Sequence, residues 1–568
     1  MSKSSLELQK WLYRFGIIVV IWVAISFIYS PILEVLKAAF VSDGKISLEA
    51  ASGLAKSNRV YTAITNTLLV TIFSIFTVNV VGIFQVAALE YISIRGQRLL
   101  KIAYAMPLIF VSIVAATGYD FTYGRTGVVT KAIQSVYPSL PDDWFSGLFA
   151  VVFAHTFLFT SYHYLFLRAA FRRVDFSVIE AAKSLGASNY RAFVSVVLPL
   201  LLPTIFATSL LIAYKSLSSF SIPSVVGGRD FDMASELILT LNSLRRADMA
   251  AMLSIGLGLA IIACILVMQW VEKRGSYVGG AKIPVPIQPI KIGNPLANAG
   301  VHALAYVIAA LQTVPVLLVV AFSFAPAKSI LTDVFPSSFS LGNYITVLQG
   351  GQAFDPLKNS IAMGICAVAL GLAVSIFVVI LTDKHRDNKA VTALDLSFML
   401  PWLLPMPLIA IGLIMAFATP NILLGGATLL GTFWILPIGY AIVVTPLMIR
   451  FLRAAFWSID PALGEAGRTL GASPLVVFLK ITLPAVFPVI IVVAGMNINT
   501  ILSEYTVSAF LFNVNNKPLS IALFEGSRSA NPEQAAINLV YMTLIMAFSF
   551  FVIILADKYG LGKGPIRK

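Results

Sequence analysis

Residues 166–203 read FLRAAFRRVDFSVIEAAKSLGASNYRAFVSVVLPLLLP, and residues 451–488 read FLRAAFWSIDPALGEAGRTLGASPLVVFLKITLPAVFP. The two stretches align without a gap at an offset of 285 residues, and 17 of 38 positions are identical. The identities include polar pairs such as Arg168 with Arg453, which a shared apolar bias would not align. A repeat at a fixed offset indicates that the chain is built from two related halves.

Composition places these halves in a membrane. The chain has 568 residues, of which 58% are hydrophobic and only 12% are charged, and its mean hydropathy is +0.89. A soluble protein is about 45–50% apolar and about 25% charged, so a soluble enzyme, a disordered chain and a fibrous protein are excluded. The apolar runs are continuous rather than alternating, which excludes a β-barrel. We therefore expect an all-α polytopic membrane protein.

Twelve stretches are long and apolar enough to cross a bilayer, which takes about 20 residues. A Gly- and Pro-rich segment, 272–297, separates six from six and is predicted to be a cytoplasmic linker. This division predicts a first unit at 1–271 and a second unit at 298–568. The expected spans are roughly 15–33, 60–89, 102–119, 144–167, 192–214, 249–271, 298–324, 359–382, 396–418, 427–449, 481–503 and 537–556.

The basic residues predict the orientation of these spans. Of 40 Lys and Arg, 26 lie at the termini and in the loops that share their side. Because Lys and Arg collect in cytoplasmic loops, both termini are expected in the cytoplasm. The same preference explains the net charge of +14 without any binding of nucleic acid. Six spans per unit give the two halves the same orientation, so the fold class is twelve transmembrane helices in two parallel six-helix repeats.

The most similar part of the repeat is a polar loop, at about 168–191 in the first unit and about 450–480 in the second. Both copies lie on the cytoplasmic face, which suggests two equal partners docking there. Each copy fits two short helices joined at a glycine that permits positive φ. The alternative is an amphipathic loop that packs on its own bundle with solvated glutamates. The candidate docking residues are Glu180, Ala181, Ala182, Gly186, Glu465, Ala466, Gly467 and Gly471.

The segments EAAKSLGAS…LP (180–199) and EAGRTLGAS…LP (465–484) resemble the EAA loop of binding-protein-dependent ABC importer permeases. Two fused six-span units are similar to the ferric-iron permease type, with 2-aminoethylphosphonate permeases close in layout. The resemblance implies a bacterial inner-membrane protein that works with two copies of a cytoplasmic ATP-binding subunit and a periplasmic or lipoprotein solute-binding protein. It also implies that each loop docks on one ATP-binding subunit. Gly467 departs from the pattern, which usually has Ala there.

The chain carries no chemistry of its own. It contains no G-x-x-x-x-G-K-[ST] phosphate loop, so ATP hydrolysis is expected on another chain. No His, Cys, Asp or Glu cluster has metal-ligand spacing, and no cofactor is expected. His155, in the fourth span, is expected to be a hydrogen-bonded packing residue rather than a cargo ligand. The apolar cores of the spans contain essentially no charged residue, whereas ion-coupled carriers usually place such groups at mid-membrane.

A substrate path is predicted where span five ends. In the resembling family this end helps line the path, and by the offset Ser218–Pro223 corresponds to Ser503–Ser508. The acid in these segments is either a polar contact on the path or a solvated carboxylate at a helix end. The candidate residues are Ser219, Phe220, Glu504 and Tyr505.

The leading hypothesis is the permease subunit of an ATP-driven importer, with ferric iron as the first cargo and 2-aminoethylphosphonate as the next. A twelve-span secondary transporter is the alternative, since such carriers also have parallel halves. The missing intramembrane charges weigh against it. An intramembrane enzyme is a third possibility, against which the absent catalytic constellation weighs.

Overall fold

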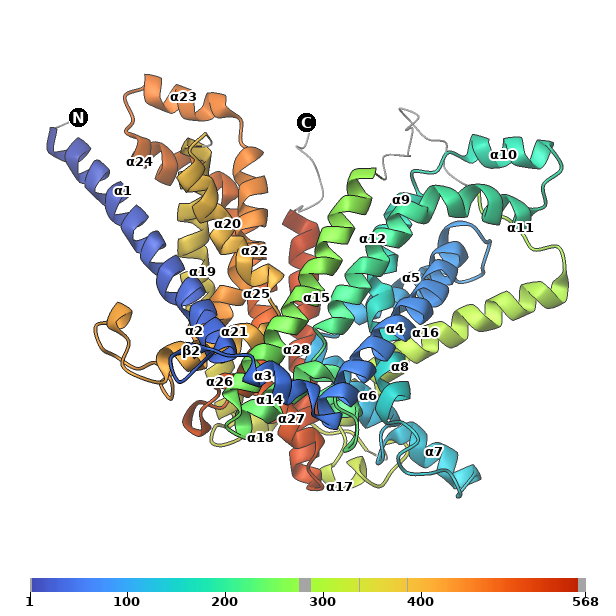
Figure 1. The fold of residues 1–568 in the computed structure, drawn as a ribbon. Helices are drawn as coiled ribbons and strands as arrows, with labels where there is room; N and C mark the ends of the chain where they lie inside the picture. The colour runs from blue at the N-terminus through green and yellow to red at the C-terminus, as the bar shows by residue number, and fades with distance from the viewer. Residues whose placement is uncertain (1–2, 275–287, 337, 386, 560–568) are drawn as a thin grey trace.

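The computed structural model describes residues 3–274, 288–336, 338–385 and 387–559, and these are helical almost throughout (Figure 1). One short antiparallel hairpin joins β1 (Val41–Ser42) to β2 (Lys45–Ile46), with Val41 opposite Ile46. The expected all-α polytopic membrane protein is confirmed.

Ten continuous helical segments in the described residues are long and apolar enough to cross a membrane, and two bent helix pairs bring the number to twelve. Each of them overlaps one expected span. The ten segments are Tyr13–Phe40, Asn58–Glu90, Gly147–Phe171, Asn189–Leu217, Ala247–Val271, Pro295–Ser323, Asp355–Lys384, Ile435–Trp457, Pro474–Leu502 and Pro532–Tyr559.

The third and ninth spans are broken rather than continuous. Gln97–Leu108 (α5 and η2) meets Ser112–Val136 (α6 and α7) at 114°, and Lys389–Leu403 (α20) meets Met406–Phe417 (α21) at 111°. Proline explains the second break, because it disfavours helical geometry in the residue before it. Leu404, which precedes Pro405, has an extended backbone. The expected spans 102–119 and 396–418 are thus each divided by a sharp bend.

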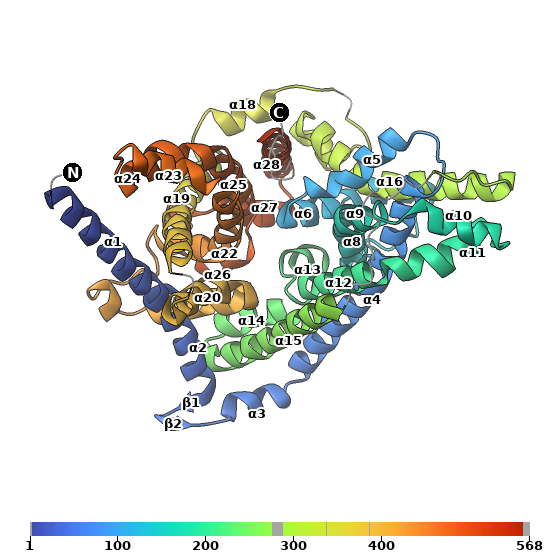
Figure 2. The ribbon, with the colours of Figure 1, turned by 90° about the horizontal axis from the view of Figure 1, so that it is seen from above.

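The first helix of each unit lies against the other unit. The first span consists of α1 (Lys3–Ala24), the π-helix η1 (Ile25–Tyr29) and α2 (Ser30–Phe40). Val20 and Ala24 pack with residues of the second half such as Ile449. Conversely, α16 (Pro295–Ser323) packs on the first half, and Tyr104 donates a hydrogen bond to its Ala305 carbonyl. Figure 2 shows this exchange, with α1 beside α19 and α16 beside α5. The unit boundaries 1–271 and 298–568 stay a prediction.

The repeat extends well beyond the two similar loops. Every helix between residues 176 and 274 begins 285 positions before its counterpart between 461 and 559. The offset is thus kept over 99 residues without an insertion. The matched pairs are α10 (Phe176–Ser184) and α23 (Pro461–Thr469), α11 (Asn189–Ala192) and α24 (Pro474–Val477), η4 (Phe193–Val197) and η6 (Phe478–Thr482), α12 (Leu198–Leu217) and α25 (Leu483–Leu502), α13 (Ser221–Val226) and α26 (Thr506–Leu511), α14 (Ala234–Ser243) and α27 (Leu519–Ser527), and α15 (Ala247–Arg274) and α28 (Pro532–Tyr559).

Half of the predicted linker 272–297, residues 275–287, lies outside the described residues. Its last part is tied to the turn after the second span, because Ser93 donates to the Ile290 carbonyl and Ile290 donates to the Tyr91 carbonyl. The remaining helices are α3 (Glu49–Ala55), α4 (Asn58–Glu90), α5 (Gln97–Ala105), η2 (Met106–Leu108), α6 (Ser112–Tyr123), α7 (Val128–Val136), α8 (Gly147–Tyr162), η3 (His163–Leu167), α9 (Arg168–Phe171), α17 (Ala327–Ile330), α18 (Gly342–Leu348), α19 (Asp355–Lys384), η5 (Ile422–Leu424), α22 (Ile435–Trp457) and η7 (Val514–Asn516).

Candidate coupling loops and translocation path

The two copies of the polar loop form helices α10 and α23, which project from the same end of the bundle (Figure 1). Both helices start in the same way. Asp175 caps α10 by accepting from the Ser177 N–H, and Asp460 caps α23 by accepting from the Ala462 N–H. Such caps satisfy N–H groups that have no partner within the helix.

Both helices also end in the same way, at a glycine. Gly186 has φ +88° and Gly471 has φ +82°, with open space around the position of a Cβ. Ala187 donates to the Ala182 carbonyl, the bond that closes a Schellman motif. Glycine is therefore required here by the left-handed backbone conformation and not by a lack of space for a side chain.

One face of each loop packs on the bundle. Phe176 and Ile179 are buried in a cluster with Phe171 and Tyr91, and Ala182 is partly buried at its edge. Gly467 occupies the matched position in α23, where an added Cβ would lie 2.9 Å from the Ile481 side chain. This tight contact accounts for glycine where the pattern usually has alanine.

The other face of each loop is open. Glu180, Ala181, Glu465 and Ala466 are all exposed. Beside them stand two leucines that the sequence analysis missed, Leu185, which is 90% exposed, and Leu470, which is 88% exposed. The two leucines are related by the offset of 285. Because both copies of the loop have leucine at this position, the sequence repeat could have indicated them. The loop thus combines a packed face with a solvent-exposed apolar and acidic face.

Ion pairs fasten each loop to the bundle. In the first unit the Arg168 guanidinium lies 2.5 Å from the Glu90 carboxylate, at the end of α4, and Arg172 reaches the same carboxylate at 3.1 Å. In the second unit Arg453, the counterpart of Arg168, pairs with Asp395 of α20. Each loop is thus joined at its base to a neighbouring span by an ion pair.

At the far end of α12 and α25, two matched aromatic rings face each other. The chain leaves helical geometry between α12 and α13, and again between α25 and α26. Phe220 lies in the first break and Tyr505 in the second; both are buried, and their ring centroids are 5.5 Å apart. Because the two positions are related by the offset of 285, the rings meet where the two units meet. Phe524 packs on Tyr505 at 4.8 Å. Phe220, Tyr505 and Phe524 thus form a cluster of three aromatic rings, here called the aromatic closure.

The other two predicted path residues support these segments instead of facing an open path. Ser219 Oγ lies 2.9 Å from Nε2 of the fully buried His155, whose Nδ1 is 3.0 Å from Ser74 Oγ. This agrees with the packing interpretation of His155. Glu504 is only 8% exposed, and its carboxylate accepts the backbone N–H groups of Thr506 and Val507 at 2.9 and 2.8 Å.

Glu504 is therefore a buried cap of α26, which corrects the alternative of a solvated helix-end acid. Burial raises the pKa of its carboxyl to about 7, and the backbone N–H groups that it accepts oppose the rise.

The span cores are less free of charge than the sequence indicated. Helix α12 continues to Leu217 and so includes Lys215, while Asp120 lies in α6. The Lys215 ammonium group lies near Tyr162 and 5.8 Å from the Tyr214 ring centroid. No ion pair between described residues involves Lys215. A cation thus lies one helical turn before Ser219.

Comparison with known proteins agrees with this architecture. The family described as binding-protein-dependent transport system inner membrane component matches residues 91–274 and 379–558. Each match therefore contains one polar loop and one of the two buried rings Phe220 and Tyr505. A protein of Sinorhizobium fredii named as a probable ABC transporter permease is 51% identical over 100% of this chain and 99% of its own length.

Two more distant relatives cover different shares of the chain. A ferric transport system permease protein of Actinobacillus pleuropneumoniae is 24% identical over 86% of this chain and 70% of its own length. A protein of Salmonella paratyphi A, named as a putative 2-aminoethylphosphonate transport system permease, is 24% identical over 42% of this chain and 91% of its own length. The chain belongs to the family of binding-protein-dependent transport system inner membrane components, in which it is a fused, two-unit ABC importer permease.

Proposed function

We propose that each of the loops α10 and α23 docks on one copy of an ATP-binding subunit that hydrolyses ATP for the transporter. The observation that carries this proposal is the matched exposure of Leu185 and Leu470. Leucines this exposed at two repeat-related sites on one end of the bundle fit two identical grooves on a partner. Glu180 and Glu465 stand beside them as acceptors for a partner's Arg or Lys. This end of the bundle, with the start of α1 and the end of α28, then faces the cytoplasm.

One continuous span joins each docking loop to the aromatic closure. Asn189–Leu217 follows directly on the first loop and ends three residues before Phe220. At 1.5 Å per residue this span is about 40 Å long. Pro474–Leu502 makes the same connection to Tyr505. Movement of the ATP-binding subunits would be carried along these two helices and separate the rings, which opens the path to the solute-binding protein.

For the cargo, ferric iron is the first candidate, because the ferric permease relative matches most of the chain. An anion such as 2-aminoethylphosphonate is the second, and Lys215 is the specific observation that favours it. A lysine without an acidic partner, close to the closure, attracts anions and repels cations.

Uptake into vesicles that hold the chain, the ATP-binding subunit and the solute-binding protein tests both points. ATP-dependent entry of ferric iron and no entry of 2-aminoethylphosphonate would support the first cargo. The reverse would support the second. Entry of either without the ATP-binding subunit would contradict the proposal.

A further inference from the structure

A second feature of the fold lies away from the loops and the aromatic closure. Between the exchanged first span and the second unit is a cavity of about 400 Å³, here called the α1 socket. Its walls come from α1 and η1, α19, α20 and α22, and its lining on α22 runs from Trp434, which precedes the helix, to Thr445. The socket thus occupies the half of the bundle that is distant from α23.

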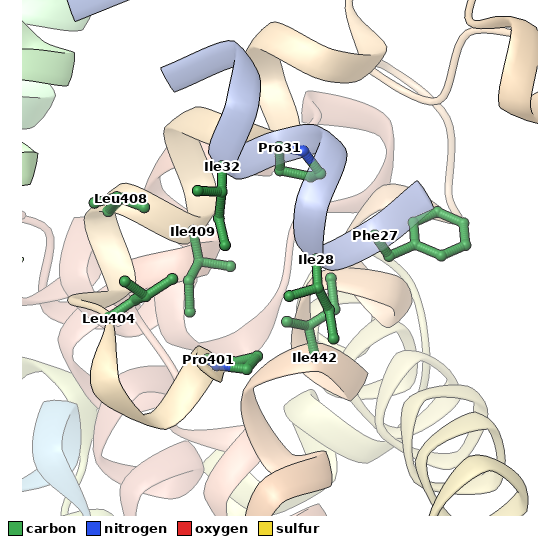
Figure 3. A pocket seen from close by; sticks show the side chains of 9 residues that line it. All are labelled: Phe27, Ile28, Pro31, Ile32, Pro401, Leu404, Leu408, Ile409 and Ile442. Atoms are coloured by element: carbon green, nitrogen blue, oxygen red, sulfur yellow. The ribbon is translucent and has the colours of Figure 1, made fainter. Parts of the chain in front are cut away.

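The inner wall of the socket is built from the distorted parts of two spans. Ile28 of the π-helix η1, Pro401 of α20 and Ile442 of α22 line the socket and also line a much smaller void beside it. Figure 3 shows these three side chains gathered from their separate helices around that void. π-Helical turns widen a helix locally and occur often at functional sites.

The first unit has a counterpart of this socket. By the offset of 285, Thr445 corresponds to Thr160. The second span of each unit can be aligned through its contact with the fourth span. Gly82 packs against His163, and Gly371 packs against Met448. His163 and Met448 are related by the offset of 285, so Gly82 corresponds to Gly371.

In the same alignment Gln85 of the first unit corresponds to Val374 of the second unit, which lines the α1 socket. In the first unit this place is filled by polar side chains. Gln312, from the exchanged helix α16, accepts from Gln85 Nε2 at 3.0 Å and donates to Thr160 Oγ1 at 2.8 Å. All three residues are buried. The side chains of Gln85 and Gln312 thus fill the place in the first unit that corresponds to the α1 socket. In the second unit Val374 lines an open cavity at this place.

The chemistry of the α1 socket selects its occupant. The side chains of the lining are apolar apart from one hydroxyl and two indole N–H groups. Thr445 Oγ1 donates to the Ala441 carbonyl and Trp22 Nε1 donates to the Leu423 carbonyl, and the second indole belongs to Trp434 at the exposed rim. A water molecule in a cavity needs two to four polar partners, and among the described lining side chains only the Trp434 indole N–H remains to offer one. An empty cavity is destabilising in proportion to its volume. The occupant must therefore be apolar.

The route into the socket selects the source. Leu370 of α19 and Trp434, which directly precedes α22, are both exposed on the outer surface, and both line the socket. That surface faces lipid, and tryptophan is enriched where membrane helices meet the headgroup region. We propose that the α1 socket binds one acyl chain of a bilayer phospholipid, which fills in the second unit the place that Gln85 and Gln312 fill in the first.

Native mass spectrometry of the full-length chain tests this proposal without ATP or cargo, so its outcome is independent of the proposed function. The protein is washed in mild detergent until loosely held lipid is lost, and is then titrated with dioleoylphosphatidylethanolamine. Ala441→Phe fills the socket, and Ile365→Phe places the same side chain at an exposed α19 position outside the lining.

The expected result is one phospholipid retained by the wild type and by Ile365→Phe, and a loss of at least tenfold in its occupancy in Ala441→Phe. Equal retention in Ala441→Phe, or no retained lipid in the wild type, would overturn the proposal. If Ala441→Phe does not elute as a folded protein, Leu370→Trp at the exposed rim replaces it, with Ile365→Trp as its control. Undiminished occupancy in Leu370→Trp overturns the proposal equally.

Discussion

Replacing the two exposed leucines of the loops should weaken assembly with the ATP-binding subunit while leaving the membrane fold intact. Leu185 and Leu470 have almost no contacts to lose within the chain, because they are 90% and 88% exposed. Their substitution by alanine therefore acts on the partner interface. Most surface substitutions change folding stability by less than about 0.5 kcal/mol.

The size of the effect follows from the buried carbons. Leu→Ala removes three carbons, and each buried methylene is worth about 0.8 kcal/mol. Each loop should lose roughly 2 kcal/mol of docking free energy, which corresponds to about thirtyfold in affinity. In the double variant Leu185→Ala/Leu470→Ala both losses apply, so the ATP-binding subunit should dissociate during purification.

The assay is co-purification of the ATP-binding subunit with the permease, together with ATPase stimulation by the loaded solute-binding protein. Ile422→Ala is the control, since Ile422 is 91% exposed and precedes α22, at the end opposite α23. Normal co-purification and stimulation in the double leucine variant would refute the docking role. A similar loss in Ile422→Ala would show that the effect is not specific to the loops.

Three further predictions follow from the repeat and the closure. Phe220→Ala should let cargo leak from vesicles without ATP, because truncation of a buried phenylalanine destabilises the packing around it by about 3–5 kcal/mol. The same leak from Phe206→Ala, at an exposed position of α12, would contradict this. Cysteines at the exposed matched positions Ser184 and Thr469 should both be labelled from the cytoplasmic side by a membrane-impermeant reagent, and labelling from opposite sides would rule out parallel units. Lys215→Gln should slow uptake of an anionic cargo severalfold and leave a cationic cargo unchanged or faster; unchanged anion uptake would remove Lys215 from the path.

Much of the loop could be predicted because its features are local. A cap such as Asp175, a left-handed glycine such as Gly186 and an exposed glutamate each depend on a few neighbouring residues, and the repeat showed every one of them twice. Gly467 is the informative exception. Its cause is a side chain, Ile481, that only the folded loop brings within 2.9 Å of a Cβ.

Features that depend on tertiary contacts could not be predicted. The exchange of α1 and α16 between units leaves no mark in hydropathy, since either helix is apolar wherever it packs. Glu504 could be recognised as a helix-end acid, but its burial depends on how the surrounding helices pack. Phe220 and Tyr505 were placed on the path, yet their mutual contact follows from the offset of 285 only once the two units are known to meet there.

The central claim is that this chain imports its cargo through docking of two loops on a separate ATP-binding subunit. The most direct measurement is cargo uptake into vesicles carrying the wild-type chain or the double variant Glu180→Gln/Glu465→Gln, with the ATP-binding subunit and ATP on the face that exposes α10 and α23. The account predicts uptake by the wild type that ceases when the subunit or ATP is omitted, and at least a tenfold reduction in the variant, whose membrane insertion is unchanged. Uptake driven by an ion gradient in the absence of the ATP-binding subunit, or equal ATP-driven uptake by the variant, would contradict it.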